Sequence, residues 1–376
     1  MSDLVAFETP ASGARGLAGA GYPRALVARS IAVPALLTGL LALAPAVLPV
    51  PTLLTMQEIL ALAVFATATN LLLGLAGMVS FGQAVFYGVG AYTVALGWLH
   101  WQLPFWLLFA AAPITGALAA ALVGLVALRA RRLYFALLTL AFSELSYQLV
   151  EQGTSFTQGA NGVFGPMVPV TLTVPATGYW FLLAVAVVSL LALWKITSSP
   201  FGLVLRGIRE NRQRMEALGV NTYRHLLAAF VVSGAFCGLA GAMFVVYSQS
   251  ASPDLLDWTM SGTPVLMSVI GGMYVFLGPA IGSLIYQFGH DLLIGFLPDW
   301  QLVLGAVLLL IVLLRPDGLA AAIPTGPIHA AWRQWRGREA QPGQPALIRA
   351  STGQAGGAAP ASVTGDPKAA AAGEAP

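Results

Sequence analysis

The chain has 376 residues, and only 9% of them are charged, against roughly 25% in an ordinary soluble domain. Hydrophobic residues make up 57% of the sequence and the mean hydropathy is +0.79, so a membrane must surround most of the folded chain. A net charge of +3 spread over this length excludes a nucleic-acid-binding surface. The single cysteine, Cys237, excludes an intramolecular disulfide and a cysteine-based zinc cluster.

The 18 Lys and Arg residues gather in four clusters, and the blocks between the clusters contain neither residue type. The clusters occupy residues 15–29, 129–132, 195–224 and 315–368. Cytoplasmic segments of membrane proteins are enriched in Lys and Arg, so we predict that all four clusters, and with them both termini, lie in the cytoplasm. Each apolar block must then cross the membrane an even number of times.

The block lengths predict four, two and four crossings, since a membrane helix needs about 20 mostly apolar residues. The predicted spans are Ile31–Val50, Thr52–Gly74, Ser80–Leu99, Pro104–Leu128, Leu133–Val150, Tyr179–Ile196, His225–Ser248, Trp258–Phe276, Gly278–Gly295 and Trp300–Leu314. The predicted fold class is an all-α polytopic membrane protein with about ten transmembrane helices. Two points stay open. The Gly-rich third span could be re-entrant, and the first span could be a signal peptide, although Pro45 disfavours cleavage after Ala44.

This topology divides the chain into three parts. Residues 1–30 form a cytoplasmic N-terminal segment, residues 31–314 form the transmembrane domain, and residues 315–376 form a cytoplasmic tail. From Ile323 onward the tail is rich in Ala, Gly, Pro and Gln, a composition typical of disorder. The transmembrane domain carries an outside loop at residues 151–178 and a cytoplasmic loop at residues 197–224.

The tetrapeptide Gly-Leu-Ala-Gly occurs at Gly74–Gly77 and again at Gly238–Gly241. The copies lie in the second and seventh predicted helices, which are five helices apart in order, so they have opposite orientations in the membrane, as in an inverted repeat whose interrupted helices line a central site. In a chain rich in Gly, Leu and Ala, a match of four residues also arises by chance. Both interpretations stay open.

Glycine is unusually dense in the segment Asn70–Tyr92, which contains five glycines in 23 residues. At membrane depth glycine permits close helix packing, and it also permits broken helices whose backbone groups line a polar path. Asn70, Ser80 and Gln83 lie in the same segment and favour the second interpretation.

Four ionisable residues inside predicted spans are Glu58, Glu144, His290 and Asp291. Isolating a charge in lipid costs at least about 2.5–3.5 kcal/mol, so such residues are candidates for function. Glu144 lies 12 residues after Arg132, or about 18 Å into the bilayer. It is either a pathway residue or a buried structural carboxyl. Glu58 could simply be hydrated, and His290-Asp291 could relay protons or lie near the outer interface.

The third basic cluster contains a helix signature. Ser199 and Pro200 predict a helix start, and Gly219 predicts its end. Between them apolar residues recur at helical spacing and arginines occupy most remaining turns, which predicts one amphipathic helix, or two short ones, on the cytoplasmic membrane face. Attraction to anionic lipid explains the basic character. It does not explain the compact helix-then-glycine turn of Glu216–Gly219.

Several catalytic motifs are absent from the sequence. There is no GxxxxGK[ST] loop, so this chain does not bind ATP through a P-loop, and its energy must come from elsewhere. Neither a GxSxG nucleophile elbow nor an HExxH zinc helix occurs, and the four histidines are scattered. We therefore expect no enzymatic activity, no catalytic residue, no metal site and no cofactor in this chain.

Eight segments together resemble one known family. They are Asn70–Tyr92, Arg132–Phe142, Thr157–Gly162, Ser199–Asn211, Glu216–Gly219, Ser252–Asp254, Gly271-Gly272 and Leu277–Pro279. Taken jointly and in this order, they resemble the permease subunits of branched-chain amino acid ABC transporters, and the M-type of the two homologous permeases in particular. The resemblance covers roughly residues 30–320.

The resemblance implies a ten-helix permease in the bacterial inner membrane, in contact with lipid but not with nucleic acid. It would pair with a second homologous permease, two cytoplasmic ATPases that hold ATP and Mg²⁺, and a periplasmic or lipid-anchored solute-binding protein. By the same resemblance, the loop that couples to the ATPases contains Arg209, Glu210, Glu216, Ala217 and Gly219. The candidate pathway residues are Asn70, Gly77, Ser80, Gln83, Thr139 and Glu144. The candidates for docking of the binding protein are Asn161, Asp254 and Asp257.

One motif departs from the family pattern. Family members usually follow the glycine pair with another glycine and a Gly-Thr, whereas Met273-Tyr274-Val275 follow Gly271-Gly272 here. This departure leaves the solute open among branched-chain amino acids, urea, short amides and aromatic acids. The alternative function is an ion-coupled secondary transporter that uses Glu144 or His290-Asp291 for protons. A membrane enzyme would need a paired carboxylate or a metal motif, and the sequence shows neither.

Overall fold

The computed structural model describes residues 48–130 and 132–294, together with the single residues 41, 45, 302, 303, 305 and 319. All of them belong to one compact unit. Apart from these single positions and residues 48–50, the predicted first and tenth spans, the N-terminal segment and the tail lie outside the described residues. The count of ten helices and the location of the two termini therefore stay predictions.

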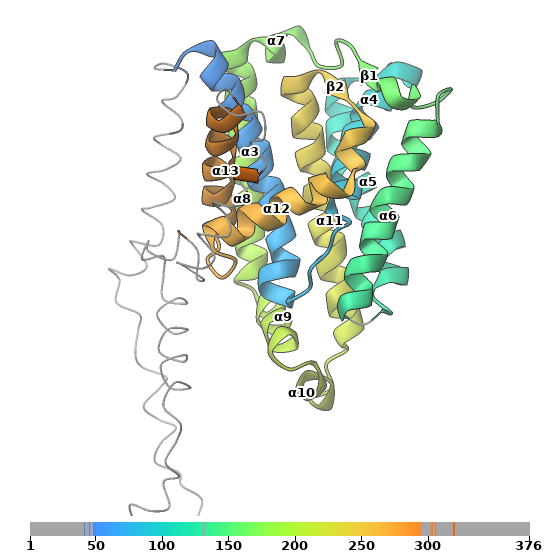
Figure 1. The fold of residues 1–376 in the computed structure, drawn as a ribbon, viewed down its shortest axis with the longest axis vertical. Coiled ribbons are helices and arrows are strands. Elements are labelled where there is room, and N and C mark those ends of the chain that lie inside the picture. The colour runs from blue at the N-terminus through green and yellow to red at the C-terminus, as the bar shows by residue number, and fades with distance from the viewer. Residues whose placement is uncertain are drawn as a thin grey trace, which may run out of the picture. The chain divides into compact units, whose positions relative to one another are not determined.

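The described chain is mostly helical, and its long helices run side by side (Figure 1). In chain order the elements are α3 (Val50–Asn70), the π-helix η2 (Leu71–Ala76), α4 (Gln83–Trp101), α5 (Phe105–Ala127), α6 (Arg132–Gln152), η3 (Gly159–Asn161), β1 (Val163–Phe164), α7 (Val170–Thr173), α8 (Pro175–Thr197), α9 (Pro200–Glu210), α10 (Arg212–Ala217), α11 (Thr222–Ser248), β2 (Ser250–Ala251), η4 (Pro253–Leu256), α12 (Trp258–Gly271) and α13 (Gly278–Ile294).

Five of the described helical segments are long and apolar enough to cross a membrane. They are Val50–Ala76, Phe105–Ala127, Leu133–Gln152, Pro175–Thr197 and Thr222–Ser248. These segments coincide with the second, fourth, fifth, sixth and seventh predicted spans. The prediction of an all-α, multi-pass membrane protein is confirmed at this level.

The third and eighth predicted spans have different bounds in the structure. α4 begins at Gln83 rather than at Ser80, because the chain is not helical over residues 77–82. α12 has only 14 residues, about 21 Å at 1.5 Å per residue, and Gly272 ends it with a φ of 107°. A helix of this length is shorter than the roughly 30 Å hydrocarbon core, so it does not form the continuous span expected for Trp258–Phe276.

Local sequence explains where several helices begin. Pro175 and Pro200 stand at the first positions of α8 and α9, where the fixed φ of proline suits a helix and its missing N–H costs nothing. The side chains of Asn211, Asn221 and Asp257 accept backbone N–H groups at the starts of α10, α11 and α12.

The core of the domain is built around α11, which packs against α3, α4 and α5. Small residues make the approach close: a Cβ atom at Gly90 would overlap the backbone of Gly238, and one at Gly116 would overlap the carbonyl oxygen of Gly234. The second Gly-Leu-Ala-Gly copy, Gly238–Gly241, therefore lies in the middle of a packed helix. The first copy ends a helix at Gly77, so the two copies do not occupy equivalent positions.

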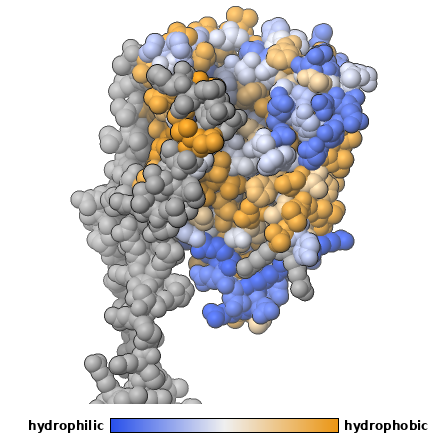
Figure 2. All heavy atoms as spheres, viewed as in Figure 1, coloured by the Kyte–Doolittle hydropathy of each residue, from blue (hydrophilic) through white to orange (hydrophobic). Residues whose placement is uncertain are grey.

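The polar segments collect at two opposite ends of the helices. α9 and α10 lie at one end, and α7 and the β1–β2 pair lie at the other (Figure 1). Figure 2 shows apolar surface between hydrophilic surface over α9 and α10 and hydrophilic surface at the opposite end. Residues 197–224 and residues 151–178 thus lie at opposite ends of the helices, and their sides of the membrane stay a prediction.

Candidate functional site

The interruption between α3 and α4 is the most unusual backbone feature inside the helical domain. The π-helix η2 ends at Gly77, which adopts a left-handed φ of 69° and donates its N–H to the carbonyl of Leu72. Residues 77–82 then run without helical structure to the start of α4 at Gln83. Non-helical backbone at membrane depth occurs where protein or a water-filled cavity surrounds it. This interruption is therefore a candidate functional element.

Buried hydroxyl groups satisfy the backbone of the interruption. The Thr139 hydroxyl accepts the N–H of Phe81 at 3.1 Å, the Ser80 hydroxyl accepts that of Gly82 at 3.3 Å, and the Ser261 hydroxyl accepts that of Ala84 at 2.9 Å. All three hydroxyl-bearing residues are buried. The structure thus brings the predicted residues Ser80 and Thr139 together at the start of α4, where they support its backbone.

Gln83 lies beside this start and is fully buried. Its Oε1 accepts hydrogen bonds from the Ser233 hydroxyl at 3.1 Å and from the Cys237 thiol at 3.3 Å, both on α11. Among the described residues its Nε2 has no hydrogen-bond partner, and neither does Oδ1 of Asn70. Two predicted pathway residues therefore keep unused hydrogen-bonding capacity inside the domain.

Asn70 connects α3 with the other half of the chain. Its Nδ2 donates to the carbonyl oxygen of Met273 at 3.1 Å. Met273 belongs to the loop 272–277 between α12 and α13. This loop contains Met273-Tyr274-Val275, the residues that depart from the family pattern. The residues that depart from the family pattern are thus in direct contact with the end of α3, where the helix is interrupted.

Glu144 lies on α6, where it is half-buried and accepts a hydrogen bond from Gln148 Nε2 at 3.0 Å. Gln148 in turn accepts from Gln152 Nε2 at 3.3 Å, which makes a polar row of three residues along one side of the helix. The neighbouring Ser143 faces inward and donates to the carbonyl of Leu256 at 2.7 Å. Within the described residues no hydrogen bond joins Glu144 to Asn70 or Gln83, so the predicted pathway residues form two separate groups.

The predicted cytoplasmic amphipathic segment consists of two helices. Asn211 breaks it with an extended backbone (φ −154°, ψ 100°), and its side chain caps α10 by accepting the N–H of Arg214 at 2.9 Å. Leu205 and Ile208 of α9 are buried against the domain, whereas Leu203 and the whole of α10 except Met215 are exposed. α10 therefore projects away from the membrane domain.

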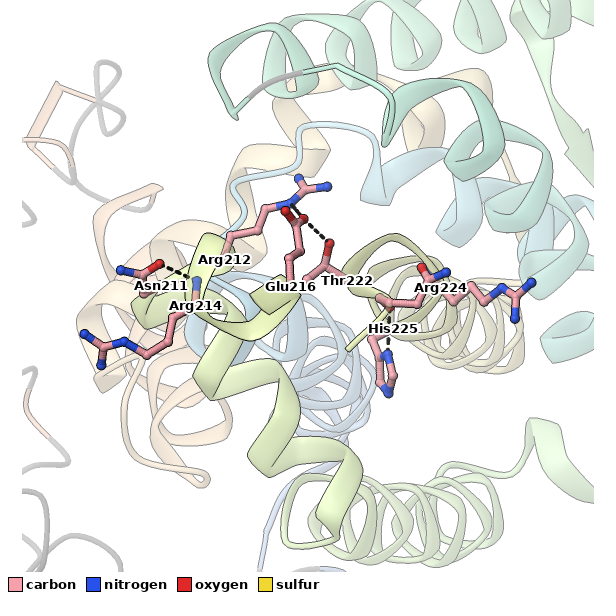
Figure 3. A network of polar contacts seen from close by, with 8 residues as sticks. Asn211, Arg212, Arg214, Glu216, Thr222, Arg224 and His225 are labelled. Carbon is pink, nitrogen blue, oxygen red and sulfur yellow. Dashed lines mark hydrogen bonds and ion pairs between the residues drawn. The ribbon is translucent and has the colours of Figure 1, made fainter. Parts of the chain in front are cut away.

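Glu216 fixes the corner between α10 and α11 (Figure 3). Its Oε1 accepts hydrogen bonds from Thr222 Oγ1 at 2.7 Å and from Arg212 Nε at 2.9 Å. The hydrogen bond from Thr222, followed by the one from Arg212, lowers the pKa of the Glu216 carboxyl. Gly219 completes the turn with a left-handed φ of 82°, and Ala217 is exposed beside it. The predicted helix-then-glycine turn is confirmed as a structure.

Arg209 and Glu210 end α9, and they point in different directions. Glu210 is exposed, whereas Arg209 is half-buried and donates through Nη1 to the carbonyl oxygen of Gly74. The Arg209 guanidinium also lies over the Tyr274 ring, with Cζ 4.8 Å from the ring centroid. The structure therefore places this predicted ATPase-coupling residue against the interrupted helix, not on the free cytoplasmic surface.

The three predicted docking residues lie at the opposite end. β1 and β2 pair antiparallel, with Val163 opposite Ala251, and this pairing joins the chain near Asn161 to the chain near Asp254. Asn161 and Asp254 are exposed. Asp257 is half-buried and caps α12, because its carboxylate accepts the backbone N–H of Thr259 at 2.7 Å and the Thr259 hydroxyl.

The His290-Asp291 pair is tied to α3. Asp291 accepts hydrogen bonds from Thr55 Oγ1 at 3.1 Å and from Gln287 Nε2 at 3.2 Å, and His290 Nδ1 lies 3.2 Å from it. This arrangement gives the carboxylate several hydrogen-bond partners, and a role in a proton relay stays a prediction. Within residues 48–130 and 132–294, no three His, Cys, Asp or Glu side chains cluster as a metal ion would require.

Sequence reasoning missed Ser233, Cys237 and Ser261, which all contact the start of α4 or Gln83. Each is a small residue within an otherwise apolar span. Ser233 and Cys237 lie four residues apart on one face of α11, but only the packing of α11 and α12 against α4 shows what these residues contact.

Comparison with known proteins identifies the family. Residues 52–313 match the family described as the permease component of the branched-chain amino acid transport system. The chain belongs to this family. The family model and the relatives bear out the resemblance found in the sequence, and these relatives are transport permeases.

Individual relatives show a range of solutes. The chain is 29% identical over 277 residues to the high-affinity branched-chain amino acid permease LivM of Escherichia coli, covering 66% of this chain and 65% of LivM. It is 27% identical over 237 residues to a probable LivM of Methanocaldococcus jannaschii, covering 58% of this chain and 67% of that protein. A nucleoside permease, NupC of Lactococcus lactis, is 32% identical over 102 residues, which are 27% of this chain and 31% of NupC. No solved structure matches the chain.

Proposed function

We propose that this chain is the permease subunit of an ABC importer in the bacterial inner membrane, and that its solute is a branched-chain amino acid or a similar small molecule. Hydrolysis of ATP would occur on two separate cytoplasmic ATPases. A second homologous permease would complete the pathway, and a periplasmic or lipid-anchored binding protein would deliver the solute. The relatives support this class of solute, although they include nucleoside permeases as well.

The observation that carries the proposal is the α9–α10 segment. The chain belongs to a transport family, and its sequence contains no P-loop, so an importer built on it would take its energy from ATPases on other proteins. α10 projects from the membrane domain with its side chains exposed, and Glu216 fixes its orientation through Arg212 and Thr222. A short exposed helix with a fixed base is suited to dock into a partner and to transmit its movement.

The polar row on α6 supports a pathway next to a second protein. Only 17% of the residues in the apolar window of this helix are buried within the chain. A charged Glu144 in contact with hydrocarbon would cost at least about 2.5–3.5 kcal/mol. This side of α6 therefore requires water or protein, and a second permease would supply both by enclosing a solute path.

The docking candidates fit delivery from the other side of the membrane. Asn161 and Asp254 are exposed on neighbouring segments that the β1–β2 pair holds together, at the end opposite α10. A binding protein that docks there would release its solute at the outer mouth of the path. Movement of α10 at the cytoplasmic end would then change which side of the membrane the path opens to.

The proposal is tested by purifying the chain from its native membrane in mild detergent and identifying its companions by mass spectrometry. Stoichiometric recovery of a second permease and two P-loop ATPases would support it. Recovery of the chain alone, with a detergent that preserves other ABC complexes, would contradict it. In that case, uptake that collapses with an uncoupler while ATP is maintained would establish the ion-coupled alternative.

A further inference from the structure

Arg209 holds together three segments that are far apart in the sequence. It belongs to the last turn of α9, whereas Gly74 belongs to η2 and Tyr274 to the loop 272–277. The guanidinium donates to the Gly74 carbonyl and lies over the Tyr274 ring, with Cζ 4.8 Å from the ring centroid. A Cβ atom on Gly77 would overlap Cγ of Arg209, so the arginine also packs against the turn that ends η2.

The contact has a physical reason. Carbonyl groups at the end of a helix have no further helical partner and carry partial negative charge, so a cation is stabilised there. A planar guanidinium can donate to a carbonyl and at the same time lie over an aromatic ring. Gly77, with its left-handed φ of 69° and without a side chain, leaves room for the arginine stem.

The same end of α3 and η2 is also tied to the loop 272–277 by Asn70, which donates to Met273. The cytoplasmic α9, the interrupted helix and this loop are therefore one connected unit, and in Figure 1 the lower end of the α3–η2 helix lies close to α9. The loop contains the residues that depart from the family pattern, and one of these, Tyr274, is the ring that Arg209 covers.

We propose that Arg209 is the positioning residue that transmits movement of α9 and α10 to the interrupted helix and to the loop 272–277. Its role is internal to the permease, whereas Glu210 and α10 present the exposed surface. The inference rests on the proposed function in one respect, since ATPases are taken as the source of the movement. The contact between Arg209 and Tyr274 can be tested without that assumption.

The first experiment is a double-mutant cycle on the purified full-length chain in detergent, read as thermal unfolding. The variants are Arg209→Ala, Tyr274→Leu and the double variant, and Tyr274→Phe serves as the matched control because it keeps the ring. We expect the effects of Arg209→Ala and Tyr274→Leu to be non-additive, whereas those of Arg209→Ala and Tyr274→Phe should add, because the ring that the guanidinium covers is kept. The exposed Arg214 provides a second control, since Arg214→Ala and Tyr274→Leu should add. Additive effects for Arg209 and Tyr274 would overturn the contact.

The second experiment measures transmission in native membranes that contain the whole complex. Val79 is 39% exposed in the interruption, and Cys237 is fully buried, so a Val79→Cys variant offers one accessible thiol among the described residues. Its rate of labelling by a membrane-permeant maleimide would be compared with and without ATP and vanadate, which trap P-loop ATPases. Labelling of the chain with Val79 unchanged gives the background.

We expect ATP and vanadate to change the labelling rate at position 79, and Arg209→Ala to reduce this change by about tenfold, as expected for loss of a charge-assisted hydrogen bond. Arg214→Ala should leave the change intact. An unaltered response in Arg209→Ala would overturn the proposal. If ATP and vanadate do not change the labelling rate even in the wild-type chain, the proposed transmission is also overturned. Co-purification of ATPases from the same membranes then shows whether the proposed importer function fails as well.

Discussion

The side-chain amide of Asn70 donates to the backbone carbonyl of Met273 across 203 positions of sequence. This hydrogen bond joins the last turn of α3 to the loop between α12 and α13. A Cβ atom on Gly74, one turn further along, would overlap both the Met273 carbonyl oxygen and Asn70 Oδ1. The seam between the two segments therefore has no room for a side chain at this position.

The Gly74→Ala variant should destabilise the domain by about 1–3 kcal/mol, the usual cost of forcing extra atoms into a packed interior. The matched control is Gly262→Ala, since a Cβ atom at Gly262 would meet nothing within 4 Å. Thermal unfolding of the two purified variants in the same detergent compares them directly. Equal melting temperatures would show that the seam opens without cost.

Glu144→Gln should lower solute uptake by at least about tenfold if the carboxylate contacts a cationic group of the solute, since a hydrogen bond to a charged group contributes about 1.5–3 kcal/mol. Assembly of the complex should not change, because Gln148 can still donate to the amide oxygen. Uptake of labelled leucine into cells measures the effect. Glu151→Gln, at the C-terminal end of the same helix, is the control. Uptake that matches the wild type would remove Glu144 from the pathway.

Glu216→Gln separates the charge of this residue from its shape, because the amide oxygen can still accept from Thr222 and Arg212. Hydrogen bonds from these residues lower the pKa of the folded-state carboxyl below its usual 4.5. A lowered folded-state pKa means that the ionised form stabilises the fold above the unfolded-state pKa, and that this contribution is lost as the pH falls through the folded-state value.

The difference in melting temperature between wild type and Glu216→Gln should therefore be complete at pH 7 and should disappear in strong acid. Thermal unfolding measured between pH 7 and pH 3 follows this change. A difference that stays constant over the whole range would show that the carboxylate charge does not stabilise the corner between α10 and α11.

Asp257→Ala should destabilise the chain by about 0.5–2 kcal/mol, because it removes the cap that accepts the Thr259 N–H at the start of α12. Asp254→Ala changes an exposed carboxylate on the preceding turn and should leave stability within about 0.5 kcal/mol. Thermal unfolding distinguishes the two variants. If Asp254 docks the binding protein, Asp254→Ala should lose solute uptake although its stability is unchanged.

Local features of the fold were predictable because neighbouring residues determine them. Pro200 starts α9 and Gly219 ends the turn after α10, and both effects need only a few residues of sequence. Five membrane helices were equally clear from apolar length. The break at Asn211 was left open between one helix and two, since a single extended residue inside an amphipathic pattern does not disturb its periodicity.

The contacts of the candidate site were not predictable in the same way. Arg209 was placed in the coupling loop because of its segment, but its partner Gly74 lies 135 positions earlier. Helical periodicity shows that Arg209 does not lie on the apolar face of α9. It cannot show which distant carbonyl oxygen the guanidinium contacts. Ser80 and Thr139 were selected as polar residues at membrane depth, and only the packing shows that they support the start of α4.

The cluster around Gly74 also sets an order for biogenesis. At about 5–20 residues per second, the ribosome needs roughly 7–27 s after Gly74 to reach Arg209, and longer to reach Tyr274. During this interval α3 enters the bilayer without the guanidinium and the aromatic ring that later cover its end. The contacts of Arg209 and Tyr274 with the end of η2 therefore form late in co-translational insertion. A nascent chain that stops before residue 274 contains the membrane helices of its first half, but the Tyr274 ring does not yet cover the Arg209 guanidinium at this end.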